Sequence, residues 1–241
     1  MLPLGFKPTE ELPGGHCSRV YANENQVLKV PFQGEELQSG FRASLVLESR
    51  GGPKVFASEL DTGSVLMERI RPGTTLSDAH LPESEAIAIF IQAIKKLRNA
   101  PTDGMLPVEQ YFTGTHPLLK KLIDTSPPPV FLHGDLHHGN ILAGPSGSWI
   151  TIDPKGLYGD PNFEAAAFLR NPTDDLGDAN HMNALADSRL RILETSFGWD
   201  PARMVAWCWL DLHLYSEGRS PDDPWAILES VLASRLSPEF V

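Results

Sequence analysis

The sequence predicts an α+β protein with two lobes: a small N-terminal lobe built on a β-sheet (residues 1–70) and a larger, mainly helical lobe (residues 71–241). Three observations favour this class. Short β-leaning runs separated by turn residues fill the first lobe, whereas the second half of the chain carries long amphipathic helix patterns. Two further strand patterns, at residues 140–143 and 149–152, flank a turn rich in Gly, Pro and Ser, which predicts a β-hairpin inside the helical lobe.

The predicted N-terminal lobe contains two clear strand patterns with a helix between them. The first strand pattern is Val27-Leu28-Lys29-Val30, and it ends at Pro31. The second covers residues 64–70 and ends at Pro72-Gly73, where we expect the hinge between the lobes. Residues 35–47 between them are expected to form one helix. Its apolar face is expected to hold Leu37, Phe41 and Leu45.

The second lobe shows several helix start signals. Leu81-Pro82 opens one helix, and residues 181–196 form another that ends at Gly198. Asp200-Pro201 and Asp223-Pro224 each combine a capping side chain with a proline at the first helical position. The helix after Pro201 is apolar almost all round, so we expect it to be buried.

Composition and charge exclude several classes of protein. The 241 residues include 20 Lys and Arg against 31 Asp and Glu, a net charge of −11, and 41% are apolar, which is typical of a globular protein. The acidic balance argues against a nucleic-acid partner. No apolar run approaches the roughly 18 residues of a membrane span. The N-terminus has no signal-peptide pattern, and Cys17 and Cys208 match no metal or redox spacing, so a cytoplasmic protein with reduced thiols and no membrane partner is expected.

One segment carries the chemistry. Asp135 and Asn140 flank a loop that contains Gly139, and Asp153 ends the next strand. The predicted hairpin returns Asp153 close to Asn140, so an amide oxygen and a carboxylate converge there. Mg²⁺ bound to nucleotide phosphates requires such hard oxygen ligands. Asp135 is then left to orient a hydroxyl group and accept its proton.

These residues resemble the aminoglycoside phosphotransferase family, which shares the protein-kinase-like fold. His133 to Asn140 matches its H-G-D-x-x-x-x-N catalytic loop, and Ile152-Asp153 matches its I-D metal strand. The continuation over residues 153–166 is similar to the branch with the streptomycin kinases and the aminoglycoside/hydroxyurea resistance kinases. The resemblance covers about residues 14–172. It implies Asp135 as the catalytic base, with Asn140 and Asp153 as Mg²⁺ ligands.

The resemblance extends to nucleotide binding in the N-terminal lobe. It implies that the turn at residues 14–18 covers the nucleotide phosphates through Gly15 and Ser18, and that Lys29 binds the phosphates. Glycine pairs also mark ordinary turns, and Lys29 could equally lie on an exposed sheet edge. The ion-pair partner of Lys29 would be Glu35 or Glu36. The hinge residues Met67, Glu68 and Ile70 are expected to bind adenine through their backbone.

The expected function is ATP- and Mg²⁺-dependent transfer of the γ-phosphoryl group to a hydroxyl of a small molecule, such as an aminoglycoside-like or other cationic amino sugar. The net charge of −11 favours a cationic acceptor. The stretch between Arg98 and His133 is only about 34 residues long, and family members build their acceptor pocket there. The acceptor could therefore be a metabolite, such as another amino sugar or an amino alcohol.

Two other functions fit parts of the pattern. A non-catalytic ATP-binding module with the kinase fold would keep the same motifs without turnover. A metallohydrolase could use His133, His137 and His138 with Asp135 to bind zinc, but this leaves Asn140 unexplained.

The C-terminal helices also leave alternatives open. Asp211 and Glu217 could face a cationic substrate or could be solvated acids. The aromatic residues nearby fit a helical core better than a ligand cage. They are Trp207, Trp209, Tyr215 and Trp225.

Overall fold

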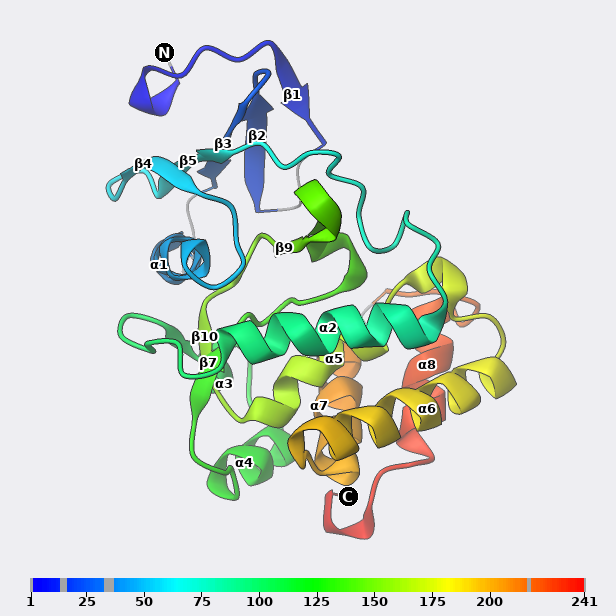
Figure 1. The fold of residues 1–241 in the computed structure, drawn as a ribbon. Helices are drawn as coiled ribbons and strands as arrows, with labels where there is room; N and C mark the ends of the chain where they lie inside the picture. Colours follow the sequence, from blue (N-terminus) through cyan, green and yellow to red (C-terminus); the bar gives the residue numbers. More distant parts are fainter. Residues whose placement is uncertain (1, 14–16, 33–36, 216–217, 241) are drawn as a thin grey trace.

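The computed structural model describes residues 2–13, 17–32, 37–215 and 218–240. The chain folds into a small sheet-containing lobe that lies above a larger helical lobe (Figure 1). This is the predicted fold class. The lobe boundary at residue 70 stays a prediction, although the last strand of the first sheet ends at Glu68.

An antiparallel five-stranded sheet forms the N-terminal lobe in the order β1-β2-β3-β5-β4. Its strands are β1 (Glu10–Leu12), β2 (Ser18–Ala22), β3 (Gln26–Pro31), β4 (Val55–Glu59) and β5 (Ser64–Glu68). The two strand patterns of the sequence correspond to β3 and β5. Because β3 is the central strand, Lys29 is paired with Val20 on one side and Val65 on the other. Lys29 is therefore not an edge residue.

Helix α1 (Leu37–Glu48) follows β3, and its buried face differs from the predicted one. Phe41 is buried as expected, but Leu45 is 36% exposed. The inward face carries Gly40, Ala43 and Leu47 instead. This prediction was wrong because small residues let the helix approach another backbone closely. A Cβ atom on Gly40 would lie 3.2 Å from the carbonyl oxygen of Pro154.

Among the residues that the structure describes, seven helices and several short 3₁₀ turns make up most of the C-terminal lobe. The predicted caps are present: Asp200 accepts a hydrogen bond from the backbone N–H of Ala202, and Asp223 accepts one from that of Trp225. The predicted helix at 181–196 begins slightly earlier, at Ala179. The helices are α2 (Glu83–Leu97), α3 (Val108–Tyr111), α4 (Pro117–Asp124), α5 (Ala165–Leu169), α6 (Ala179–Phe197), α7 (Pro201–Leu214) and α8 (Pro224–Ala233).

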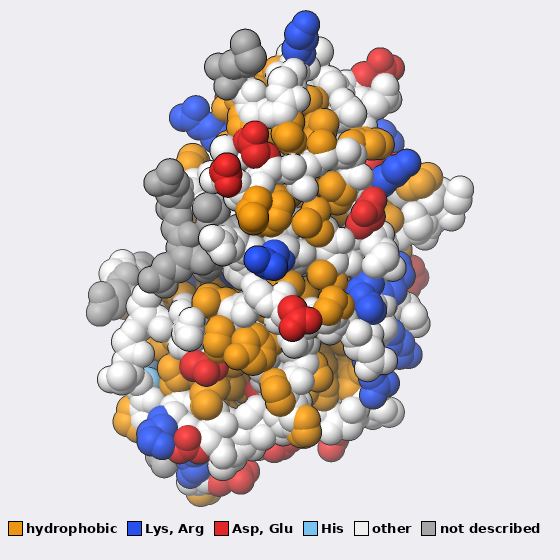
Figure 2. Space-filling view, turned by 90° about the vertical axis from the view of Figure 1, so that its left-hand side faces the viewer, with side chains coloured by type: hydrophobic (Ala, Val, Ile, Leu, Met, Phe, Trp, Pro, Cys, Tyr) orange, Lys and Arg blue, Asp and Glu red, His pale blue; other side chains and the backbone are white. Residues whose placement is uncertain are grey.

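Helix α7 lies at the centre of the C-terminal lobe and is buried almost all round, as its sequence predicts. Trp207 and Cys208 on this helix are fully buried, whereas Cys17 in the N-terminal lobe is exposed. Acidic side chains are scattered over both lobes on the face drawn in Figure 2. Among the helices of the described residues, none is both long and apolar enough to cross a membrane.

Two small sheets support the loops between the lobes. The predicted hairpin is present as β8 (Ile141–Ala143) paired antiparallel with β9 (Trp149–Thr151). A second sheet has the order β6-β10-β7. Its strands are β6 (Leu106–Pro107), β7 (Val130–Leu132) and β10 (Leu157–Gly159).

Candidate active site

The catalytic loop and the segment after β9 are joined by backbone hydrogen bonds. The backbone N–H of Ile152 donates to the carbonyl oxygen of Asn140 at 2.9 Å, and the N–H of Lys155 donates to that of His133 at 2.8 Å. The amide nitrogen of Asn140 also donates to the backbone carbonyl of Asp135 at 2.8 Å. Asp135, Asn140 and Asp153 are thereby brought together, as the predicted hairpin requires.

Helix α1 holds this segment from the other lobe. The Ser39 hydroxyl donates to the backbone carbonyl of Lys155 at 2.9 Å. Gly156 has a φ of +71°, and a Cβ atom there would lie 2.3 Å from the carbonyl oxygen of Ser39. Only glycine allows this approach without displacement of one of the two backbones. The segment that directly follows Asp153 is therefore held by contact with helix α1 of the N-terminal lobe.

His133 braces the loop and is not available to a metal. Its Nδ1 accepts from the backbone N–H of Asp135 at 3.3 Å, so its Nε2 carries the proton and donates to the carbonyl of Ile152 at 2.9 Å. His137 accepts from Gly139 through Nδ1. Among the described residues, no group of three or more His, Cys, Asp or Glu side chains is arranged to hold a metal ion. The geometry does not favour the metallohydrolase alternative.

Glu164, at the end of the 3₁₀ turn before α5, supports the same loop. Its carboxylate is buried and accepts hydrogen bonds from the backbone N–H groups of His133 at 2.7 Å and Gly134 at 3.3 Å. Burial raises the pKa of Glu164 to about 8, although these two hydrogen bonds act in the opposite direction.

As the pH is varied, the free energy of unfolding is expected to be greatest at about pH 6.5. Burial lowers the pKa of His133 to about 4 and that of His138 to about 3. Below about pH 6.5 the unfolded chain binds protons that these folded histidines do not, so stability rises with pH in this range. Above it, folded Glu164 keeps a proton that the unfolded chain has released. Stability then falls, by up to about 1.4 kcal/mol per pH unit, until the pH passes the pKa of about 8.

Urea denaturation at a series of pH values measures this profile. The variant Glu164→Gln removes the titrating group and keeps a hydrogen-bond acceptor, so its stability is expected to be nearly constant between about pH 6.5 and about pH 8. Wild-type stability that rises across this interval would contradict the assignment.

Lys29 reaches from β3 to the second predicted metal ligand. Its ammonium group contacts the Oδ1 atom of Asp153, and the two side chains are 18% and 44% exposed. Burial alone would raise the pKa of Asp153, but the charge and hydrogen bond of Lys29 outweigh it and lower the pKa. Asp153 adopts a left-handed φ of +59°, which aspartate tolerates better than most residues. This carboxylate is therefore ionised and already paired with a cation.

The other predicted nucleotide-binding residues lie in the N-terminal lobe. Ser18 is buried at the start of β2, next to the exposed Cys17. Met67 and Glu68 end β5, opposite Val27 and Gln26 of β3. Ile70 lies two residues after Glu68, beyond the end of β5. Gly15, Glu35 and Glu36 lie outside the described residues, so their predicted roles stay predictions.

The carboxylate of Asp135 faces a residue that sequence reasoning missed. The Nη2 atom of Arg170 lies 3.4 Å from its Oδ1 atom, and the Nε atom of Arg170 lies 2.9 Å from Oδ2 of Asp211. Asp211 is only 2% exposed, so it is neither a solvated acid nor a group facing a cationic substrate. Those interpretations were wrong because α7 is buried on nearly every side. Glu217 lies outside the described residues.

The aromatic residues divide between the core and the surface. Trp207 is fully buried, as a core residue would be. Trp209 stacks on His213, with ring centroids 4.5 Å apart. Tyr215 is 43% exposed, and Trp225 donates its indole N–H to the carbonyl of Arg170 at 2.9 Å. They form no common ligand cage.

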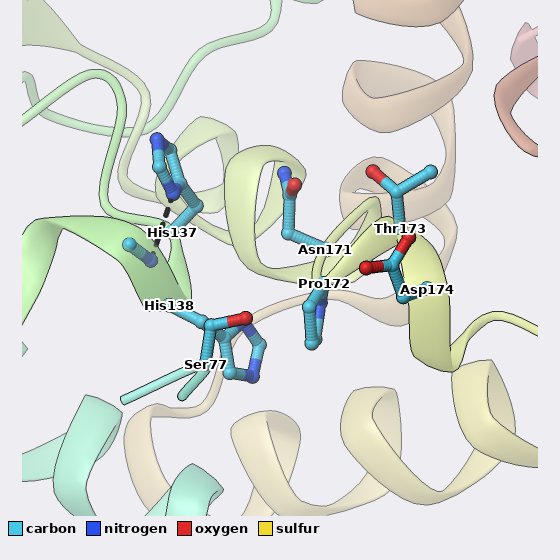
Figure 3. Close-up of a pocket in the computed structure, with 8 residues that line it drawn as sticks. Ser77, His137, His138, Asn171, Pro172, Thr173 and Asp174 are labelled. Atoms are coloured by element: carbon cyan, nitrogen blue, oxygen red, sulfur yellow. Dashed lines mark hydrogen bonds between the residues drawn. The ribbon is translucent and has the colours of Figure 1, made fainter. Parts of the chain in front are cut away.

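A cavity of about 290 Å³ lies beside the catalytic loop (Figure 3). His137, His138 and Gly139 of the loop line one side, and residues 171–174 line the other. Asp174 is exposed and supplies a carboxylate to the lining. The cavity can hold a small polar molecule next to the loop that carries Asp135.

Comparisons with known proteins agree with this geometry. The family model described as aminoglycoside/hydroxyurea antibiotic resistance kinase matches residues 118–214. A streptomycin 3''-kinase from Klebsiella pneumoniae is 29% identical over 192 residues, which cover 70% of this chain and 71% of that protein.

Solved structures share the fold. A choline/ethanolamine kinase family protein from Mesorhizobium loti superposes with a TM-score of 0.64 at 17% identity, covering 99% of this chain and 92% of that one. An aminoglycoside phosphotransferase in ternary complex with ADP and hygromycin B gives a TM-score of 0.58 at 16% identity, over 93% and 92% of the two chains. The predicted kinase-like fold is thus confirmed, and the sequence of this chain is similar to those of aminoglycoside and hydroxyurea resistance kinases.

Proposed function

We propose that this protein is a small-molecule kinase that transfers the γ-phosphoryl group of ATP to a hydroxyl group of a cationic acceptor. The observation that carries the proposal is the convergence of Asp135, Asn140 and Asp153 on two hydrogen-bonded segments, with Lys29 reaching them from the other lobe. The similarity to a streptomycin 3''-kinase supports phosphoryl transfer to an aminoglycoside-like molecule.

The nucleotide would bind between the lobes. Lys29 stands on the central strand of the N-terminal sheet, so its ammonium group can bind phosphate oxygens when it leaves Asp153. Ser18 and the predicted turn at residues 14–18 would cover the phosphates, and the backbone of residues 67–70 would bind the base. The ADP complex of a structural neighbour supports nucleotide binding at this fold.

Asn140 and Asp153 fit a magnesium ion by their chemistry. The amide nitrogen of Asn140 is committed to the backbone of Asp135, which leaves its Oδ1 atom to bind a cation. The carboxylate of Asp153 already holds a cation, the ammonium group of Lys29. Both are hard oxygen donors of the kind that Mg²⁺ prefers. When bound there, Mg²⁺ supplies positive charge against the nucleotide phosphates.

Asp135 would orient the acceptor. Its carboxylate is 23% exposed, so a hydroxyl group can reach it. In the reaction the acceptor oxygen forms a bond to the γ-phosphorus and the bond from that phosphorus to the β–γ bridging oxygen breaks. The hydroxyl proton passes to Asp135, and ADP leaves with the bonding electron pair.

The acceptor would lie in the cavity beside residues 137–139. The polar groups of Ser77, Asn171 and Thr173 in its lining suit a molecule with several hydroxyl groups. The exposed carboxylate of Asp174 suits an amino or guanidino cation. The acidic net charge of −11 would attract such a molecule. The fold of a choline/ethanolamine kinase family protein makes amino alcohols a second group to test.

The test is Mg²⁺-dependent release of ADP from ATP in the presence of streptomycin, other amino sugars, hydroxyurea or amino alcohols. At least one acceptor is expected to stimulate release by the wild-type protein. Asp135→Asn is expected to lose this stimulation by a factor of about 10² to 10⁴ while still binding ATP.

Asp124→Asn is the matched control, because Asp124 is an exposed partner of Lys120 on α4 and is expected to leave the rate unchanged. Wild-type rates in Asp135→Asn would rule out Asp135 as the base. ATP binding without transfer to any acceptor would instead favour a non-catalytic binding module.

A further inference from the structure

Three charged side chains form a continuous chain from the catalytic loop into the core of the helical lobe. They are Asp135, Arg170 and Asp211. Arg170 lies between the other two and touches both, although 35 residues separate it from Asp135 and 41 separate it from Asp211. This arrangement has a use in phosphoryl transfer, and the role of Arg170 rests on that proposed function.

We propose that Arg170 is a positioning residue that holds one oxygen of Asp135, so that the other oxygen faces the acceptor hydroxyl, and that buried Asp211 holds Arg170 in place. Arg170 would contact no substrate. Its effect on the reaction would pass through the carboxylate of Asp135.

The backbone of Arg170 is fixed from two directions. Its N–H donates to the carbonyl of Ala166 at 3.2 Å at the end of α5. Its carbonyl accepts the indole N–H of Trp225, on α8, at 2.9 Å. The guanidinium group also lies 5.7 Å from the centroid of the Trp225 ring. With its side chain only 12% exposed, Arg170 has little freedom to move.

The two distances from Arg170 differ in a way that suits a base. The contact with Asp211 is 2.9 Å, whereas the contact with Asp135 is 3.4 Å. Asp211 therefore offsets most of the arginine charge, and Asp135 receives a weaker contact through Oδ1 alone. A stronger, two-point contact would compete with the proton that a base must accept. Oδ2 of Asp135 is left for the hydroxyl group.

Asp211 differs from a carboxylate that serves only the fold. Within the described part of the chain, its Oδ1 atom is buried and has no hydrogen-bond partner. By contrast, both oxygens of buried Asp160 are satisfied, by donors from Asn162, Arg203 and Trp207. Burying a carboxylate with an unpaired oxygen costs stability. The fold tolerates that cost at the residue that holds Arg170.

The buried pair of Arg203 and Asp160 is a matched control for the test. Arg203 is 8% exposed and donates to Asp160 through Nε at 2.9 Å, but it has no contact with the catalytic loop in the described structure. The variants Arg170→Lys and Arg203→Lys both keep the charge and lose the planar fork of donors. Both variants therefore remove a guanidinium group from a buried ion pair, but only Arg170→Lys does so beside the catalytic loop.

Steady-state kinetics with ATP and the stimulating acceptor are the measurement, with thermal melting to check the fold. Arg170→Lys and Arg170→Ala are expected to lower kcat about 10- to 100-fold and to change the KM for ATP by less than about two-fold. Guanidinium ion in the buffer is expected to restore part of the kcat of Arg170→Ala, whereas Arg203→Lys is expected to lower the melting temperature and keep kcat.

Four results separate the possible outcomes. Folded Arg170 variants with wild-type kcat would overturn the positioning role, as would a kcat of Arg170→Ala that guanidinium ion does not raise. If Asp135→Asn is inactive while the Arg170 variants are active, the proposed function stands and only the role of Arg170 fails. If Asp135→Asn itself keeps wild-type activity, the assignment of the base fails, and the role of Arg170 fails with it.

Discussion

Replacing Asp153 with alanine is expected to lower Mg²⁺-dependent ATP turnover by a factor on the order of 10³. Phosphoryl transfer depends on charge held against the phosphates, and the change removes one of two proposed metal ligands. The same change frees Lys29 from its partner. Asp153 is 44% exposed, so its ion pair contributes little to stability and the variant is expected to fold normally.

Turnover measured against Mg²⁺ concentration tests this expectation. If Asp153 is a metal ligand, a high Mg²⁺ concentration is expected to recover part of the lost rate. If Asp153 is only structural, a high Mg²⁺ concentration is expected to have no effect on the rate. Asp187→Ala is a suitable control, because Asp187 is an exposed residue of α6 whose ion pair with Arg235 lies outside the proposed site. Near-normal turnover of Asp153→Ala at low Mg²⁺ would remove Asp153 from the metal site.

The largest effect on stability is expected from Asp160→Ala. Asp160 is fully buried, and its carboxylate accepts from the side chains of Arg203, Trp207 and Asn162. Removing it leaves the Arg203 charge buried without its partner, which typically costs about 3–5 kcal/mol in the free energy of unfolding.

Urea denaturation at a fixed pH gives this difference directly. Asp124→Ala removes an exposed carboxylate from an i,i+4 pair with Lys120 and is expected to cost about 0.5 kcal/mol or less. If Asp160→Ala lost no more than this control, the buried ion pair would not be the main anchor between α7 and the segment before α5.

The parts of the site that lie close together in the chain could be predicted from sequence. Asp135 and Asn140 are five residues apart, and one hairpin brings Asp153 back to them. The helix starts at Asp200 and Asp223 could also be predicted, because a capping side chain and a following proline are local signals. For these elements, residue chemistry and short-range geometry are sufficient.

The contacts between distant elements could not be predicted in this way. Nothing near Arg170 in the sequence indicates Asp211, because their meeting depends on how α5 packs against α7. The exposure of Leu45 has a similar cause: the close approach of α1 to residues 154–156 decides which face of the helix is buried. Periodicity identifies an apolar stripe but not the backbone that it meets.

The two cysteines differ in their surroundings, so a thiol reagent can label one of them selectively in the folded protein. Cys208 is enclosed in the centre of α7, where burial raises the pKa of its thiol, so it is inert to thiol reagents in the folded state. Cys17 is exposed and directly precedes Ser18. A maleimide dye therefore attaches at one place, beside the segment proposed to cover the phosphates. Its fluorescence can report nucleotide binding and release without any engineered cysteine.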